Sequence, residues 1–299
     1  MSLLVVGSVA LDDIEAPGGK VQGVLGGAAC YFAVAARYMT AVRAVGVIGN
    51  DFPEEHLEFL RSREIDVEGV YRADGPTFRW GGRYHDSMNQ RDTLFTELGV
   101  FEGFEPDLPE HYRDSPYVFL ANIHPGLQTN VLRQANAPVF AAMDTMNLWI
   151  DTTRDDLLET LSLVHGLVIN DEEAQQLTGE SNLVRCAEGI RALGPQTVII
   201  KRGENGALLF DAEGIFAAPA FPLEAVIDPT GAGDTFAGGF MGAIARAGDT
   251  EPETLRRAVI SGSTMASFCV EDFSLDRFRR LSHDQIEERF EAFRRLTRF

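Results

Sequence analysis

An acidic residue directly follows two closely spaced glycines in the stretch Asp228-Pro-Thr-Gly-Ala-Gly-Asp-Thr-Phe236. Apolar residues recur after it with the spacing of one helix face, so we expect a helix to begin here. Glycines before a helix let backbone N–H groups converge on an anion, and the helix dipole adds partial positive charge. The candidate anion hole consists of Gly231, Ala232 and Gly233, with Asp234 at its mouth.

Asp234 has two interpretations. Aspartate is a good helix N-cap, which would give it a purely structural role. An acid beside an anion hole can also take a proton from a hydroxyl group that attacks a phosphate. The glycines in front of it favour the catalytic interpretation. The motif is neither a Walker loop nor Gly-x-Gly-x-x-Gly, because the required lysine and glycine spacings are missing.

A mostly parallel sheet is expected to position this stretch, because short apolar runs alternate with helical segments along most of the chain. Ligands of such sheets bind outside the carboxyl ends of the strands. Asp12, Asp144, Asn170 and Asp234 each follow a predicted strand, so we expect them at one edge. The predicted strands are 3–6, 42–48, 117–121, 139–143, 167–169, 197–200 and 221–227, with a hairpin at 208–216, and the predicted helices are 26–37, 53–63, 154–163, 172–178, 183–193, 253–268 and 283–298.

Two other segments differ in character from this alternation. Residues 67–97 contain short runs that are rich in aromatic residues and alternate between apolar and polar residues, with a hairpin signal at Asp74-Gly75. Residues 14–25 are polar and rich in glycine. Together they predict a small antiparallel sheet beside the main body. A small sheet beside a cleft is suited to act as a lid.

Length and charge exclude several classes of protein. The 299 residues suit one large α/β domain or two small ones, and 45% hydrophobic residues allow a sizeable core. The net charge of −19 argues against non-specific nucleic-acid binding and against an anionic membrane surface. The three cysteines are widely spaced, which argues against zinc and disulfides and favours a reducing cytoplasm. We find no apolar run of 18 residues and expect no membrane span.

Six segments, in order from residue 4 to about 270, resemble the PfkB-type, ribokinase-like carbohydrate kinases. The stretch from Asp228 to Phe236 resembles the C-terminal signature of that family. The others are Val5-Val-Gly-Ser-Val-Ala-Leu-Asp12, Gly26-Gly27 with Ala33-Val-Ala-Ala36, Val45-Gly-Val-Ile-Gly-Asn-Asp51, Asn170-Asp-Glu-Glu173 and Lys201-Arg-Gly-Glu-Asn-Gly206. The resemblance implies one three-layer αβα domain spanning 1–299, with a mostly parallel sheet and a small β lid.

The resemblance also implies a reaction, namely ATP-dependent phosphorylation of a hydroxymethyl group on a small sugar. Asp234 would be the base and the Gly231–Gly233 amides the anion hole. Asn170-Asp-Glu-Glu173 would meet Mg²⁺ through water, although it also reads as a complete helix capping box. The remaining implied contacts are Asp12, Gly26, Gly27, Tyr31 and Asn147 for the acceptor, Asn170, Lys201, Gly203, Gly206, Thr230 and Ser263 for the nucleotide, and Glu173 with Asn170 for Mg²⁺.

Two departures from the family pattern leave the acceptor open. Tyr31 stands where the family often has Asn, and an aromatic ring there could stack on a sugar face or a base. Asp144-Thr-Met-Asn147 lacks the Arg that often follows. A nucleoside kinase on the same fold is therefore the first alternative, also favoured by the aromatic residues Phe78, Trp80 and Tyr84. A catalytically silent nucleotide- or sugar-binding regulator is the second alternative, which the intact Asp234 disfavours.

Four features are left open by the sequence. These are the identity of the acceptor, its phosphorylation state, assistance by a monovalent cation, and a homodimer formed through the lid. The expected partners are small molecules only. Arg79, Arg83 and His85 are charges of the predicted lid that could meet a phosphorylated sugar, but solvated surface charges are the simpler interpretation.

Overall fold

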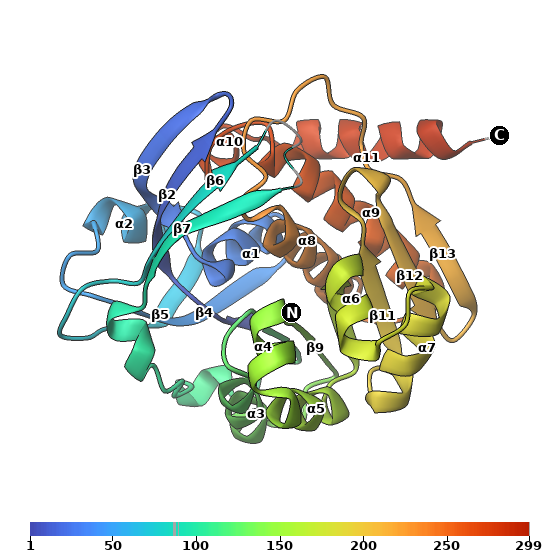
Figure 1. The fold of residues 1–299 in the computed structure, drawn as a ribbon, viewed down its shortest axis with the longest axis horizontal. Coiled ribbons are helices and arrows are strands. Elements are labelled where there is room, and N and C mark those ends of the chain that lie inside the picture. The colour runs from blue at the N-terminus through green and yellow to red at the C-terminus, as the bar shows by residue number, and fades with distance from the viewer. Residues whose placement is uncertain (86–87, 89, 299) are drawn as a thin grey trace.

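The computed structural model describes residues 1–85, 88 and 90–298, and a nine-stranded sheet forms its centre (Figure 1). Its strands are β1 (Ser2–Val6), β4 (Ala41–Ile48), β5 (Ile65–Arg72), β8 (Tyr117–Leu120), β9 (Phe140–Asp144), β10 (Gly166–Asn170), β11 (Thr197–Lys201), β12 (Ala207–Asp211) and β13 (Gly214–Ala218). They lie in the order β13-β12-β11-β10-β9-β8-β1-β4-β5. The strands from β11 to β5 are parallel, and the hairpin β12–β13 adds an antiparallel edge.

Helices cover both faces of this sheet, which is why its strands are apolar on both sides. Val5 packs into one core cluster, whereas its neighbours Leu4 and Val6 pack into the other. The helices of the first face are α1 (Ala28–Arg37), α2 (Glu54–Ser62), α8 (Ala232–Ala247), α9 (Pro252–Cys269), α10 (Asp276–Arg279) and α11 (His283–Thr297). Those of the second face are α3 (Pro125–Gln134), α4 (Asn147–Thr152), α5 (Arg154–Leu163), α6 (Asp171–Thr178) and α7 (Leu183–Leu193), and short 3₁₀ turns occur at η1 (Gly99–Gly103), η2 (Glu110–Tyr112) and η3 (Gly203–Asn205).

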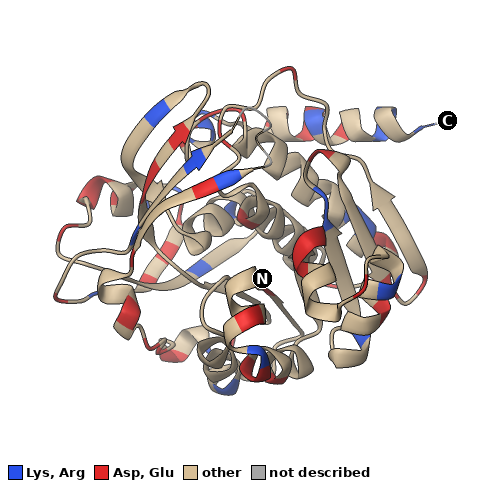
Figure 2. Ribbon diagram, in the orientation of Figure 1, with Lys and Arg blue, Asp and Glu red and all other residues tan. Residues whose placement is uncertain are grey.

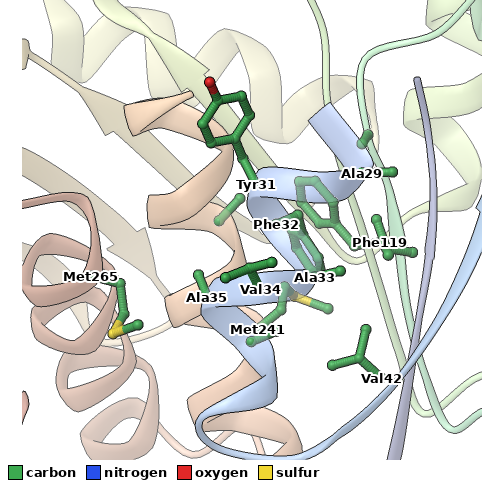
Figure 3. Packing of buried hydrophobic residues seen from close by; sticks show 14 of the residues in the cluster. Ala29, Tyr31, Phe32, Ala33, Val34, Ala35, Val42, Phe119, Met241 and Met265 are labelled. Atoms are coloured by element: carbon green, nitrogen blue, oxygen red, sulfur yellow. The ribbon is translucent and has the colours of Figure 1, made fainter. Parts of the chain in front are cut away.

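Helices α1 and α8 lie against each other in the first core, where small residues let their backbones approach closely (Figure 3). A Cβ atom on Gly238 would lie 2.3 Å from the carbonyl oxygen of Phe32, so only glycine fits there. Phe32 in turn stacks on Phe119 of β8, with ring centroids 4.5 Å apart. This packing fixes the start of α8, and with it Asp234, relative to α1 and the sheet.

A second, smaller sheet stands beside the first (Figure 1). It consists of β2 (Ala10–Ala16), β3 (Gly19–Gly26), β6 (Arg79–Tyr84) and β7 (Arg91–Glu97), in the order β3-β2-β6-β7. We call it the small sheet. Its β2 and β6 are parallel, whereas the outer pairs are antiparallel as predicted.

Three local predictions were wrong. Residues 67–72 belong to β5 of the large sheet, where they pair in parallel with β4, so Asp74-Gly75 joins two different sheets and does not close a hairpin. Residues 221–227 form no strand; Pro222 lacks an amide hydrogen, and Phe221 packs on Phe293 of α11. Of the four acidic or amide residues predicted to follow strands, Asp144 and Asn170 do end strands of the large sheet. Asp12 lies inside β2 and Asp234 inside α8.

The architecture as a whole agrees with the prediction. It is a three-layer αβα sandwich with a mostly parallel central sheet and a small separate sheet. In the described part of the chain, no helix combines the length and the apolar character that crossing a membrane requires.

Candidate active site

Backbone amides are available for an anion at the start of α8. Gly231 is the N-cap residue, with φ +74°, and no side chain caps this end of the helix. Within the described chain, we find no backbone carbonyl that accepts from the amides of Gly233 or Asp234. The N-terminal N–H groups of a helix need partners, so this end of α8 can bind an anionic group.

Lys201 places a positive charge at the same point. It is the last residue of β11, and its Nζ lies 2.8 Å from where a Cβ atom on Gly233 would be. A side chain at residue 233 would therefore displace the ammonium group. The chain contains two lysines among 26 basic residues, so a compact ammonium group is an uncommon choice in this protein. Lys201 and the amides together form a cradle for a phosphoryl group.

Asp234 has a pKa suited to accepting a proton near neutral pH. Burial is the main cause that raises its pKa to about 6, while the charges of Lys201 and Arg91 act in the opposite direction. The side chain nevertheless keeps partial exposure to solvent. A general base works best with a pKa near the working pH, and Asp234 meets that condition.

Asp12 approaches this cradle from the small sheet. Its residue is only 3% exposed, and burial raises the pKa of its carboxyl group well above the usual range, with Asp228 and Asp234 as further causes. A Cβ atom on Gly26 would lie 2.1 Å from its carboxylate, so Gly26 makes room for Asp12. Gly27, with φ +92°, starts α1 and packs against the carbonyl of Ser8. The glycine pair therefore serves local packing in any case.

Tyr31 does not offer a ring face to a ligand. The residue is 1% exposed, and a Cβ atom on Gly231 would lie 2.3 Å from its ring, so the ring packs directly against Gly231. Its hydroxyl group points away from Phe32 and Ala33 in Figure 3. The predicted stacking on a sugar or a base is therefore wrong, because the core already covers the ring.

Asn170 and Glu173 form the predicted capping box of α6. The Asn170 side chain accepts from the Glu173 amide at 2.7 Å, and the Glu173 carboxylate accepts from the Asn170 amide at 3.1 Å. Burial raises the pKa of Glu173, and Lys201 opposes this rise. Burial and Asp234 likewise raise the pKa of Asp144, which is 5% exposed and whose Oδ1 has no hydrogen-bond partner among the described residues.

These carboxylates fit Mg²⁺ held mainly by phosphate and water. Mg²⁺ usually keeps several waters and takes one or two carboxylates together with substrate phosphates. Within the described chain, no three His, Cys, Asp or Glu side chains gather as a ready-made metal cage. Glu173 and the unpaired Oδ1 of Asp144 are the groups that would hold this looser type of site, and Lys201 lowers the pKa of both carboxyl groups.

The other predicted residues are more scattered. Asn147 is exposed at the start of α4, and Ser263 is buried on α9. Gly203 (φ +52°) and Gly206 (φ +81°) form the tight turn from β11 to β12. The Thr230 hydroxyl donates to Tyr84 of β6 at 3.1 Å. The nucleotide and acceptor contacts of these residues remain predictions.

Arg91 is a site residue that the sequence did not reveal. It begins β7 opposite Tyr84, lies 5.2 Å from the ring centre of Trp80, and lowers the pKa of Asp12, Glu173 and Asp234. The sequence gives little indication of this role, because Arg91 comes close to the site only through the pairing of β6 with β7. The three cations considered at the sequence level are instead paired with acids within the small sheet, where both signs of charge occur (Figure 2): Arg79 with Asp13, Arg83 with Glu15 and His85 with Asp92.

Comparison with known proteins identifies the family. Residues 3–277 match the family model of the pfkB family carbohydrate kinases. The cytidine kinase of Thermococcus kodakarensis is 33% identical over 253 residues, which cover 82% of this chain and 89% of that protein. The nucleoside kinase of Methanocaldococcus jannaschii is 23% identical over 81% of this chain and 79% of that protein.

Solved structures agree on the fold. The aminoimidazole riboside kinase of Salmonella enterica, complexed with aminoimidazole riboside and an ATP analog, has a TM-score of 0.77 at 22% identity and covers 97% of this chain and 100% of that chain. A putative ribokinase II from E. coli in complex with ATP and Mg²⁺ has a TM-score of 0.79 at 19% identity, covering 99% of both chains.

The chain belongs to the pfkB family of carbohydrate kinases. It is therefore a phosphotransferase with a hydroxyl acceptor, and the acceptor class is a sugar or a nucleoside. The alternative of a catalytically silent regulator is not supported.

Proposed function

We propose that the protein is an ATP-dependent nucleoside kinase that phosphorylates the hydroxymethyl group of a ribose. The sequence placed a simple sugar first and a nucleoside second. The order changes because the 33% identical relative is named a cytidine kinase and further relatives are named nucleoside kinases. Mg-ATP would supply the phosphoryl group.

One observation carries the choice of a nucleoside. Asp12 of β2 and Trp80 of β6 are directly opposite in the small sheet, so a carboxylate and a large ring stand side by side on one face. Trp80 lies across Gly82, where a Cβ atom would be 2.1 Å from its ring. A carboxylate accepts hydrogen bonds from two ribose hydroxyls. The indole of Trp80, over which the Arg91 guanidinium lies, would offer an apolar surface to a base that takes the place of that cation.

The proposed roles follow from the geometry. Asp12 binds and orients the ribose hydroxyls, and Asp234 takes the proton from the attacking hydroxyl. Lys201 and the amides at the start of α8 stabilise the negative charge that develops on the transferred group, which is the main task of a protein in phosphoryl transfer. Glu173, with Asn170 and Asp144, would hold the water around Mg²⁺.

An ADP-release screen across nucleosides, sugars and sugar phosphates tests the proposal, with the product located by phosphorus NMR. We expect the highest kcat/KM with a nucleoside and phosphorylation of its hydroxymethyl group. A clear preference for a free sugar or a sugar phosphate would refute the nucleoside assignment while leaving the kinase class intact.

Trp80→Leu and Phe95→Leu form a matched pair for the same question. Both are aromatic residues of the small sheet, but Phe95 covers Gly81 on the opposite face. We expect Trp80→Leu to raise the KM for nucleosides about tenfold, in line with about 1–3 kcal/mol for loss of a stacked base. Phe95→Leu should leave that KM unchanged, and equal effects of the two variants would argue against a base at Trp80.

A further inference from the structure

The residue proposed to bind the acceptor and the proposed base lie in two separate parts of the fold. Asp12 lies in the small sheet, whereas Asp234 lies at the start of α8, which packs on the large sheet. A hydroxyl group bound to Asp12 reaches Asp234 only if these parts keep a fixed spacing. Small displacements of reacting groups cost large factors in rate, so some contact must set this spacing.

Tyr84 makes the first direct contact between them. It lies on the same face of β6 as Trp80, two pleats further along the strand. Its Oη accepts a hydrogen bond of 3.1 Å from the hydroxyl of Thr230, which immediately precedes Gly231. Both residues are 9% exposed, so water competes little for this bond.

Asp228 extends this contact through the signature stretch. The residue is fully buried, and its two carboxylate oxygens accept from the amide of Thr230 at 2.8 Å and from the amide of Ser274 at 3.0 Å. A buried carboxylate with two amide donors is a rigid link. It ties the loop before α8 to the loop after α9.

Ser274 returns the chain of bonds to the small sheet. Its hydroxyl donates to the carbonyl of Leu25 in β3 at 2.5 Å, directly before Gly26 and Gly27. Its φ of +52° is uncommon for a residue other than glycine and indicates that its surroundings hold it in place. The bonds thus run from β6 through Thr230, Asp228 and Ser274 to β3, on both sides of the strand that carries Asp12.

We propose that Tyr84 is a positioning residue for phosphoryl transfer, which holds the small sheet, and with it Asp12, at the spacing from Asp234 that the reaction needs. This inference rests on the proposed roles of Asp12 and Asp234. It adds that the Tyr84 hydroxyl acts through Thr230 and touches no substrate. The Ser274 hydroxyl performs the equivalent task on the β3 side.

Tyr84→Phe tests the inference, with Tyr38→Phe as its matched control. The Tyr38 hydroxyl donates to the carbonyls of Phe278 and Leu281, both at 3.1 Å, so the control loses a partly buried tyrosine hydroxyl on another part of the fold. We expect Tyr84→Phe to lower kcat/KM for the acceptor about 10- to 100-fold with an unchanged KM for ATP. Tyr38→Phe should change only the melting temperature.

Substitutions at Thr230 complete a double-mutant cycle. Thr230→Val should reproduce the loss, and the double variant should lose little more, because both changes remove one bond. Thr230→Ser keeps the hydroxyl and should therefore lose less acceptor kcat/KM than Thr230→Val. Because Thr230 is also a predicted nucleotide contact, the KM for ATP is measured for both variants. Additive losses, or a Tyr84→Phe enzyme with the kinetics of Tyr38→Phe, would overturn the inference.

Hydrogen exchange gives a readout that does not depend on the substrate. Without any ligand, Tyr84→Phe should speed exchange of amides in β3 and β6, whereas Tyr38→Phe should not; unchanged exchange would count against the link. If the wild-type enzyme phosphorylates a sugar, the nucleoside proposal fails, and the same kinetic comparison is made with that sugar. An active Asp234→Asn enzyme would refute the base and, with it, the spacing that Tyr84 is proposed to set, whereas wild-type kinetics of Tyr84→Phe alone would refute only the positioning role.

Discussion

The start of α8 and the small sheet meet at the hydrogen bond between Thr230 and Tyr84, but they are built differently. The first presents backbone amides and one lysine, held by helix packing in the largest core cluster. The second presents the side chains of Asp12, Trp80 and Arg91, on strands of which β7 is mostly exposed. The proposed cradle for a phosphoryl group is thus mainly backbone, whereas the side proposed to bind the acceptor consists of side chains, which can vary without a change of backbone.

The largest effect is expected on the rigid side, from removal of the base. Asp234→Asn keeps the shape of the side chain but cannot take a proton. We expect kcat to fall about 10²- to 10⁴-fold, the usual contribution of a general base, while ATP binding and folding persist. Steady-state kinetics and nucleotide titration measure both quantities, and an unchanged kcat would refute the base assignment.

Two glycine substitutions separate the two regions directly. In Gly231→Ala the new Cβ would meet the Tyr31 ring at 2.3 Å and the residue would keep φ +74°, so we expect a loss of about 1–3 kcal/mol in the free energy of unfolding. In Gly26→Ala the three atoms nearest the new Cβ would all belong to the Asp12 carboxyl group, the closest at 2.1 Å. We expect the acceptor KM to rise about tenfold with little change in stability.

Gly103→Ala is the neutral control, because nothing lies within 4 Å of its added Cβ. Denaturant unfolding and acceptor kinetics on the three variants test the contrast. If Gly26→Ala destabilised the fold as much as Gly231→Ala, the acceptor side would be as much a part of the rigid core as the cradle.

The smallest predicted effect concerns stability and pH. The pKa of Asp234 is about 6 in the folded state, above the unfolded value of about 3.9. This difference in pKa contributes stability that is fully present below pH 4 and is lost as the pH rises through 6. Without ligands, the free energy of unfolding of Asp234→Asn should therefore be about 1–2 kcal/mol higher than that of the wild type at pH 7.5. At pH 4 the two values should be equal. Glu224→Gln, at an exposed position, is the control, and a destabilised Asp234→Asn at pH 7.5 would contradict the sign.

The sequence by itself determined the fold class and the cradle. Alternating apolar strands and helices predict a covered parallel sheet from their order along the chain. Gly231 and Gly233, at the N-terminus of α8, act through the backbone, so their local sequence is sufficient to predict an anion site there. The capping box of Asn170 and Glu173 is equally local. These features depend on neighbours within a few residues.

Only the tertiary structure decided which groups join them. Tyr31 is buried under Gly231 by helix packing, so its aromatic ring does not face a ligand. Arg91 and Tyr84 reach the site because β6 pairs with both β2 and β7, and Ser274 meets Leu25 across 249 positions of sequence. Such contacts arise from pairing between distant segments, which leaves no fixed spacing in the chain. They are the contacts that we propose hold Asp12 at its spacing from Asp234.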